Sequence, residues 1–208
     1  MPSAPAPPPP PPPPPPALQQ PFSSGGHAGS REPQTRLEQP VVPAHGPPGS
    51  FLVELFVYNG HPFKHHWAYF VRSSHGPGRG VKIHATGDVN HGFTLEFKRG
   101  YDLGHTDDQQ PTTRIPLQYI DGRNVDERAM FNNGVSKIDD APVCRFESSA
   151  YKIKAPEKSL HSAGTKAAPK TRVMQRDCQT WIVESANQLV ADGIFTRDVA
   201  DYLHVLKQ

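Results

Sequence analysis

The chain has 208 residues, a formal net charge of +2 at pH 7 and only two cysteines. A charge this small, without a compact block of lysines and arginines, gives no reason to expect a nucleic-acid partner. No window is apolar enough to predict a transmembrane segment, and the start of the chain does not resemble a secretory signal, so we expect a cytoplasmic protein. In that reducing compartment Cys144 and Cys178 are expected to be free thiols.

Residues 1–50 form a proline-rich segment that holds 18 of the 25 prolines, including an unbroken run from Pro7 to Pro16. Proline fixes φ and removes a backbone donor, so the run favours polyproline II and cannot form a packed core. We therefore predict a disordered tail over residues 1–50 and one folded domain over residues 51–208. The proline run is either a spacer, which is the simpler interpretation, or a ligand for an SH3-like or profilin-like groove.

The first half of the predicted domain has the patterns of β-strands. Short runs rich in apolar and β-forming residues are separated by turn residues such as Asn59-Gly60. These runs cover residues 51–58, 66–71, 81–85 and 93–97. Their short spacing predicts an antiparallel meander. Residues 115–120 could form another strand, and residues 126–132 could form a helical turn.

The pattern changes its period after Asp177. Residues of one helix face recur at intervals of three and four: Cys178, Trp181, Ile182, Ser185, Ala186 and Leu189. Asp177 is a suitable N-cap for this helix and Gly193 a suitable stop, and a second helix is predicted from Thr196 to Leu206. The fold class that we expect is therefore α+β, with an antiparallel sheet of four to six strands packed against the Cys178 helix.

Three residues of this predicted fold could form a thiol site. Cys178 lies at the first turn of its helix, where free backbone amides favour a thiolate. His66 begins a strand and could act as the base, with one ring nitrogen within hydrogen-bond reach of the sulfur. His84, on the next strand, could bond the other nitrogen and orient the ring. The simpler alternatives are a buried core cysteine at position 178 and a satisfied strand histidine at position 84.

The segment around the histidines resembles a known family. It reads Lys64-His65-His66-Trp67-Ala68-Tyr69-Phe70-Val71 and, after a turn, Gly80-Val81-Lys82-Ile83-His84. It is similar to the histidine block of the lecithin:retinol acyltransferase and phospholipase A/acyltransferase family. The cysteine motif of that family, at the start of a helix, is similar to Asp177-Cys178-Gln179-Thr180-Trp181-Ile182-Val183-Glu184. The order of the two histidines before the cysteine is that of the permuted branch of papain-like, NlpC-type enzymes.

The resemblance implies a permuted papain-like fold with Cys178 as nucleophile, His66 as general base and acid, and His84 as the orienting residue. It also implies a thiol hydrolase or acyltransferase that acts through an acyl-enzyme, with an acyl lipid as the leading substrate and the Cys178 amide in the oxyanion hole. The residues after the cysteine, Gln179-Thr180-Trp181, depart from the Glu-His-Phe of the family. Two alternatives therefore stay open: a cysteine peptidase or amidase for a peptide or isopeptide bond, and a binding domain without activity. We expect no cofactor and, without a Cys-x2-Cys pair, no metal site.

Overall fold

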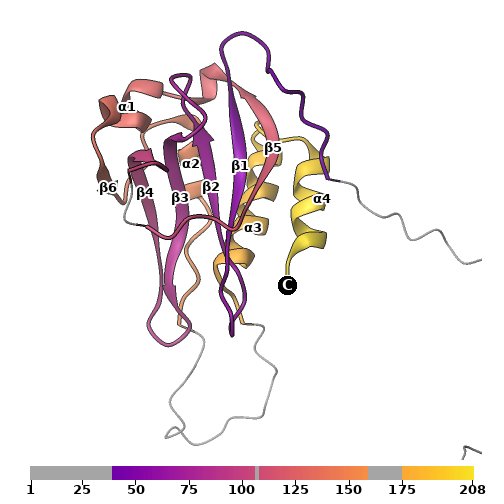
Figure 1. The fold of residues 1–208 in the computed structure, drawn as a ribbon. Coiled ribbons are helices and arrows are strands. Elements are labelled where there is room, and N and C mark those ends of the chain that lie inside the picture. Colours follow the sequence, from indigo (N-terminus) through magenta and orange to yellow (C-terminus); the bar gives the residue numbers. More distant parts are fainter. Residues whose placement is uncertain (1–38, 106–107, 159–174) are drawn as a thin grey trace, which may run out of the picture. The chain divides into compact units, whose positions relative to one another are not determined.

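The computed structural model describes residues 39–105, 108–158 and 175–208, which fold as an antiparallel sheet with helices packed against it (Figure 1). Its strands are β1 (Ser50–Tyr58), β2 (His66–Arg72), β3 (Arg79–Asp88), β4 (Gly92–Asp102), β5 (Thr113–Asp121) and β6 (Lys137–Asp139). Its α-helices are α1 (Glu127–Phe131), α2 (Arg145–Tyr151), α3 (Cys178–Ala191) and α4 (Arg197–Leu206), with short 3-10 helices η1 (Gly122–Asn124) and η2 (Asn132–Gly134). The predicted α+β class is confirmed.

The sheet has the strand order β5-β1-β2-β3-β4-β6, and all neighbouring strands are antiparallel. Strands β1 to β4 are consecutive neighbours and form the predicted meander. The pairing of β2 with β3 extends from Tyr69, opposite Ile83, only as far as Arg72, opposite Gly80. Because β2 begins three residues before Tyr69 and β3 continues beyond Ile83, the two strands stop pairing at the end that carries His66.

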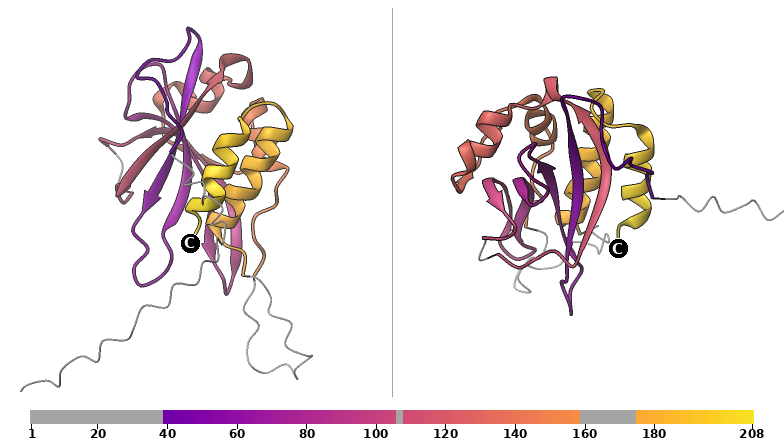
Figure 2. Two further views of the ribbon diagram at one scale, coloured as in Figure 1. Left: turned by 90° about the vertical axis from the view of Figure 1, so that its right-hand side faces the viewer. Right: turned by 45° about the horizontal axis from the view of Figure 1, so that its top comes forward.

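The two faces of the sheet bury different sets of apolar side chains, as strand alternation requires. Trp67, Tyr69 and Val71 of β2 belong to the main core, which is shared with α2, α3 and α4. Figure 2 shows the helices as a layer on this side of the sheet. A smaller apolar cluster on the other face contains Phe56, Tyr58, Ala68, Phe70 and Tyr101. Side chains at alternate positions of β2, beginning with His66, therefore point away from the helices.

Helix α3 begins and ends where the sequence predicts. The Asp177 carboxylate accepts a hydrogen bond from the Thr180 amide at 2.9 Å, which is an N-cap contact. Gly193 has φ of +72° and follows the last turn, where a left-handed residue favours glycine. Thr196 occupies the N-cap position of α4 as expected, but its side chain makes no capping hydrogen bond.

The middle of the chain contains elements that were predicted and one helix that was not. Strand β5 covers the predicted strand 115–120, and α1 covers most of the predicted turn 126–132. Helix α2 was missed. Its Glu147 is completely buried and accepts two hydrogen bonds from the Arg99 guanidinium, at 2.9 and 3.1 Å. This ion pair ties α2 to β4.

The predicted tail over residues 1–50, with the run from Pro7 to Pro16, lies mostly outside the described residues. Residues 39–49 are described and follow an irregular path. One of their carbonyl groups, that of Ala44, accepts a hydrogen bond from the Tyr119 hydroxyl of β5 at 3.2 Å. Both cysteines are free thiols, as predicted. In the described ranges, no helix combines the length and apolar character needed to cross a membrane.

Candidate thiol and histidine site

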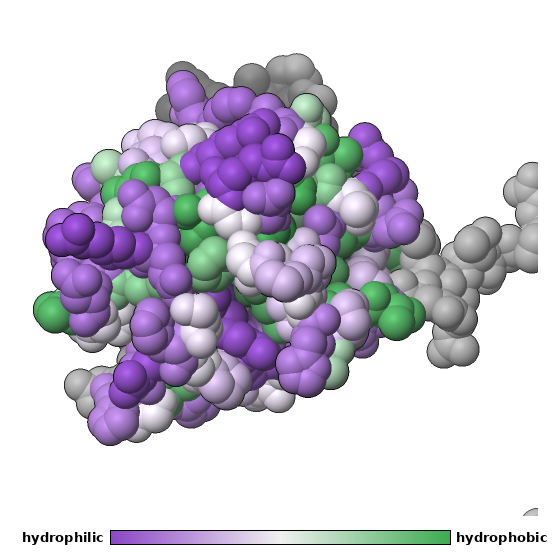
Figure 3. Space-filling view, turned by 90° about the horizontal axis from the view of Figure 1, so that it is seen from above, coloured by the Kyte–Doolittle hydropathy of each residue, from purple (hydrophilic) through white to green (hydrophobic). Residues whose placement is uncertain are grey.

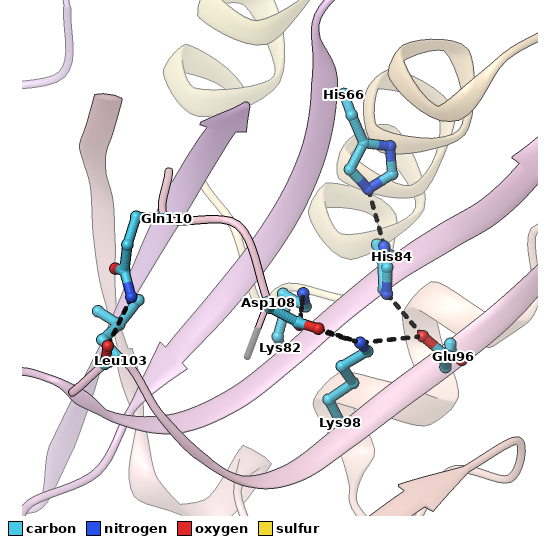
Figure 4. Close-up of polar contacts among 8 residues, drawn as sticks. All are labelled: His66, Lys82, His84, Glu96, Lys98, Leu103, Asp108 and Gln110. Atoms are coloured by element: carbon cyan, nitrogen blue, oxygen red, sulfur yellow. Dashed lines mark hydrogen bonds and ion pairs between the residues drawn. The ribbon is translucent and has the colours of Figure 1, made fainter. Parts of the chain in front are cut away.

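Three side chains form a hydrogen-bonded chain on the sheet face opposite the helices. His66 Nε2 lies 2.8 Å from His84 Nδ1, and His84 Nε2 lies 2.9 Å from Glu96 Oε2 (Figure 4). The three residues come from the neighbouring strands β2, β3 and β4. The sequence predicted the contact between the two histidines. It did not predict Glu96, which stands directly opposite His84 in the pairing of β3 with β4.

Charged side chains continue this network along the same face. Lys98 Nζ lies 3.9 Å from Glu96 Oε2 and 2.9 Å from Asp108 Oδ2. Lys82 Nζ lies 2.5 Å from the same Asp108 oxygen and 4.7 Å from the centre of the Tyr101 ring. Two ammonium groups are thus matched by two carboxylates beside the imidazoles, as Figure 4 shows.

Burial determines the protonation states of this chain. It lowers the pKa of His66 to about 3, and the positive charges of Lys82 and Lys98 act in the same direction. Burial also lowers the pKa of His84, while the hydrogen bond to Glu96 opposes that shift. The same hydrogen bond lowers the pKa of the Glu96 carboxyl. Near neutral pH both imidazoles are therefore neutral and Glu96 is a carboxylate.

Cys178 is the first residue of α3 and is 8% exposed. Its Sγ lies 4.0 Å from the carbonyl oxygen of His65, and the backbone N–H of Trp67 also interacts with the sulfur. Backbone N–H and C=O groups of a strand lie in the plane of the sheet and point to its neighbours. The neighbours of β2 in the sheet are β1 and β3, and α3 packs against both β2 and β3. The sulfur therefore occupies the opening between β2 and β3, at the end where these two strands no longer pair.

The predicted hydrogen bond between Cys178 and His66 is not present among the described residues. His66 uses Nε2 for His84, and within the described part of the chain its Nδ1 has no hydrogen-bond partner. The side chain of His66 also points away from the main core to which Cys178 belongs. The sulfur nevertheless lies beside the backbone on both sides of His66. Because Nε2 is already bonded to His84, Nδ1 is the ring nitrogen of His66 that remains available to a thiol.

Opposing influences act on the thiol of Cys178. Burial raises its pKa, and the neighbouring charge of Asp177 adds to the rise. The amides of Trp67, Gln179 and Cys178 itself lower the pKa, as expected for a sulfur at a helix start. Because burial is the largest of these influences, the Cys178 thiol is neutral near neutral pH, as the His66 imidazole is.

Polar contacts fix the start of α3 against the chain that precedes β2. Lys64 Nζ lies 3.1 Å from Asp177 Oδ2. Gln179 Nε2 donates to the His65 carbonyl at 2.8 Å, and Gln179 Oε1 accepts from the Gln208 amide at 2.9 Å. Gln179 appeared in the sequence only as a departure from the family motif, yet its completely buried side chain holds the two segments together.

A cavity of about 730 Å³ lies at the other end of β2, between the β2–β3 turn, the end of β4 and α1. Arg79, Glu127 and Arg128 are among its lining residues, whereas Cys178, His66 and His84 are not. Figure 3 looks onto this end of the molecule and shows a hollow with hydrophilic surface inside it. The cavity and the thiol are thus separate features of the fold.

Comparison with known proteins gives a family but no activity. No curated protein and no solved structure matches the chain. A family model matches residues 53–196, which include all of α3 and the whole meander except the first three residues of β1. Its description is "Family of unknown function (DUF6540)", and since the match covers more than half of the 208 residues, the chain belongs to that family.

Proposed function

We propose that this protein is a cysteine-dependent hydrolase or acyltransferase with a permuted papain-like site, which attacks an acyl ester or amide through Cys178. The observation that carries the proposal is the position of the Cys178 sulfur. It lies at the first turn of α3, in the opening between β2 and β3, beside the residues that flank a histidine already oriented by a second one. The chain order of His66, His84 and Cys178 and the resemblance of their flanking residues to the acyltransferase family support the same assignment.

The reaction begins when His66 Nδ1 takes the proton of the Cys178 thiol. The thiolate attacks the carbonyl carbon, and the oxyanion that forms is stabilised by the Cys178 amide at the helix start. His66 then passes its proton to the departing alcohol or amine, which leaves an acyl thioester on Cys178. Water or an acceptor resolves the thioester, with His66 again moving the proton. His84 bonds the Nε2–H of His66 throughout and supports the positive charge of the imidazolium.

The first step requires the His66 ring or the Cys178 side chain to turn, because no hydrogen bond joins them in the described structure. Catalytic contacts are often loose in an empty site and tighten around substrate. An acyl lipid is the leading substrate class on the strength of the family resemblance. A peptidase or amidase would use the same residues.

A binding domain without turnover is the competing function. It is supported by the low exposure of Cys178, 8%, and by the rise that burial causes in the thiol pKa. A nucleophile that is never uncovered would behave as an ordinary core cysteine.

Intact-protein mass spectrometry separates these possibilities. The protein is incubated with an acyl thioester, a phospholipid and a peptide amide, and the mass added to the chain is measured. We expect one acyl group on wild type and on Cys144→Ser, which removes the other thiol, and none on Cys178→Ser. Acylation by the lipid or thioester alone supports the lipid assignment, whereas turnover of the peptide alone supports the peptidase. If the protein stays unmodified with every donor, the result supports the competing function, a binding domain without turnover.

A further inference from the structure

The hydrogen-bonded chain of Glu96, His84 and His66 has a fixed direction, because its first member can only accept. Glu96 is a carboxylate near neutral pH, and the Lys98 ammonium 3.9 Å from it favours that charged form. An ionised carboxylate has no hydrogen to donate, so the hydrogen in the contact between His84 Nε2 and Glu96 Oε2 belongs to His84.

This direction decides the tautomer of each ring in turn. A neutral imidazole carries one hydrogen, so with Nε2 protonated the Nδ1 of His84 is a lone-pair acceptor. His84 Nδ1 faces His66 Nε2 at 2.8 Å, and that contact is a hydrogen bond only if His66 carries its hydrogen on Nε2. The Nδ1 of His66 is then left with a lone pair. With the opposite tautomers, the lone pair of His84 Nε2 would face a carboxylate.

We propose that Glu96 is a positioning residue, which acts through His84 to hold His66 in the tautomer whose Nδ1 is an unprotonated base. The assignment of the two tautomers rests on the contacts of the described residues, together with the carboxylate form of Glu96 and the neutral form of both rings. Its catalytic consequence rests on the proposed function, since Nδ1 is the nitrogen that would receive the Cys178 proton. Glu96 itself touches neither the thiol nor a reacting atom.

The tautomers can be measured without any substrate. Long-range proton–nitrogen NMR spectra of protein labelled with ¹⁵N-histidine distinguish protonated from bare ring nitrogens, and His66→Gln and His84→Gln assign the signals. In wild type near pH 8 we expect Nε2–H and bare Nδ1 for both residues. In Glu96→Ala the carboxylate is lost, and both rings should shift toward a mixture of tautomers. Glu96→Gln keeps an oxygen that can accept from His84, so its spectrum should remain closer to wild type.

Thr94→Ala is the matched control, since Thr94 is an exposed residue of β4 two positions from Glu96. It should leave both histidine spectra unchanged. Either of two results would overturn the proposal: a protonated Nδ1 on His66 or His84 in wild type, or wild-type tautomers in a folded Glu96→Ala protein. If Glu96→Ala does not fold, the wild-type tautomers together with Glu96→Gln decide the question.

Acylation of Cys178 provides the second measurement. We expect Glu96→Ala to slow it by about tenfold or more, by analogy with the loss when the outer partner of a metal-bound histidine is removed. Glu96→Gln should recover part of the rate. Wild type that shows the expected tautomers but is never acylated would refute the proposed function and leave the role of Glu96 in the tautomers intact. If Cys178 is acylated but the histidine tautomers do not change in Glu96→Ala, the positioning role of Glu96 is refuted and the proposed function stands.

Discussion

Replacing His66 with glutamine should reduce the loss of stability that the protein suffers in mild acid. Glutamine retains an N–H that can donate to His84 but does not titrate. The pKa of His66 falls from an ordinary value of 6.5 to about 3 because the ring is buried. Above pH 6.5 the imidazole is neutral in both the folded and the unfolded chain, so it contributes nothing to the pH dependence. Below that value the unfolded chain gains a proton that the folded chain does not, and the free energy of unfolding decreases.

The magnitude follows from the size of the pKa difference. A pH of 5 is about 1.5 units below the pKa of the histidine in the unfolded chain. At about 1.4 kcal/mol per unit, the free energy of unfolding therefore falls by at most about 2 kcal/mol. The value is an upper bound because the His66 ring keeps some contact with solvent. The loss would continue toward pH 3, where the folded form also takes up the proton. His84, whose pKa is also lowered by burial, acts in the same direction.

Urea unfolding at pH 7 and pH 5 measures this difference for wild type and for His66→Gln. We expect the variant to lose less stability between the two pH values, by up to about 2 kcal/mol. The matched control is His91→Gln, which removes an imidazole whose side chain is 84% exposed, and it should retain the pH dependence of wild type. Equal losses in wild type and His66→Gln would refute the argument that the folded site holds His66 as a neutral base.

Three further predictions follow from other contacts. Asp177→Ala should lower the free energy of unfolding in urea by about 1 kcal/mol because the N-cap of α3 is lost, and an unchanged value would contradict that role. Arg99→Met should lower the free energy of unfolding by about 3–5 kcal/mol because it leaves the completely buried Glu147 carboxylate without its ion-pair partner. Adding Glu147→Leu should recover part of this loss, and no recovery would contradict an ion-pair effect. His66→Ala should prevent acylation of Cys178 near pH 7 and restore part of it at alkaline pH, where the thiol ionises unaided, and acylation at the wild-type rate near pH 7 would exclude His66 as the base.

Local patterns predicted the elements whose causes are local. The alternation in residues 66–71 and the helical spacing that begins at Cys178 identified β2 and α3, and the Asp177 cap located the start of that helix. Helix α2 was not visible because it depends on a partner distant in the chain. Its Glu147 reads as a surface residue, yet it is buried against Arg99, 48 positions away.

The site could be predicted only in part for the same reason. The motif placed His66 and His84 on neighbouring strands, and the structure brings their rings together. Glu96 required the register of β3 with β4, which the strand pattern alone did not assign. The relation of Cys178 to His66 depends on where a distant helix enters the sheet and on side-chain rotation. Neither can be derived from residue types.

The separation of β2 from β3 has a consequence for how the chain folds. The meander consists of neighbouring hairpins, whereas the contact that fills the opening joins residues 113 positions apart. Contacts between distant residues form slowly because a long loop must close first. Before α3 arrives, the carbonyl of His65 and the amide of Trp67 form an exposed strand edge on which another chain could pair. A nascent or truncated chain that ends before Cys178 is therefore expected to be prone to aggregation, and docking of α3 would assemble the site and protect this edge in one step.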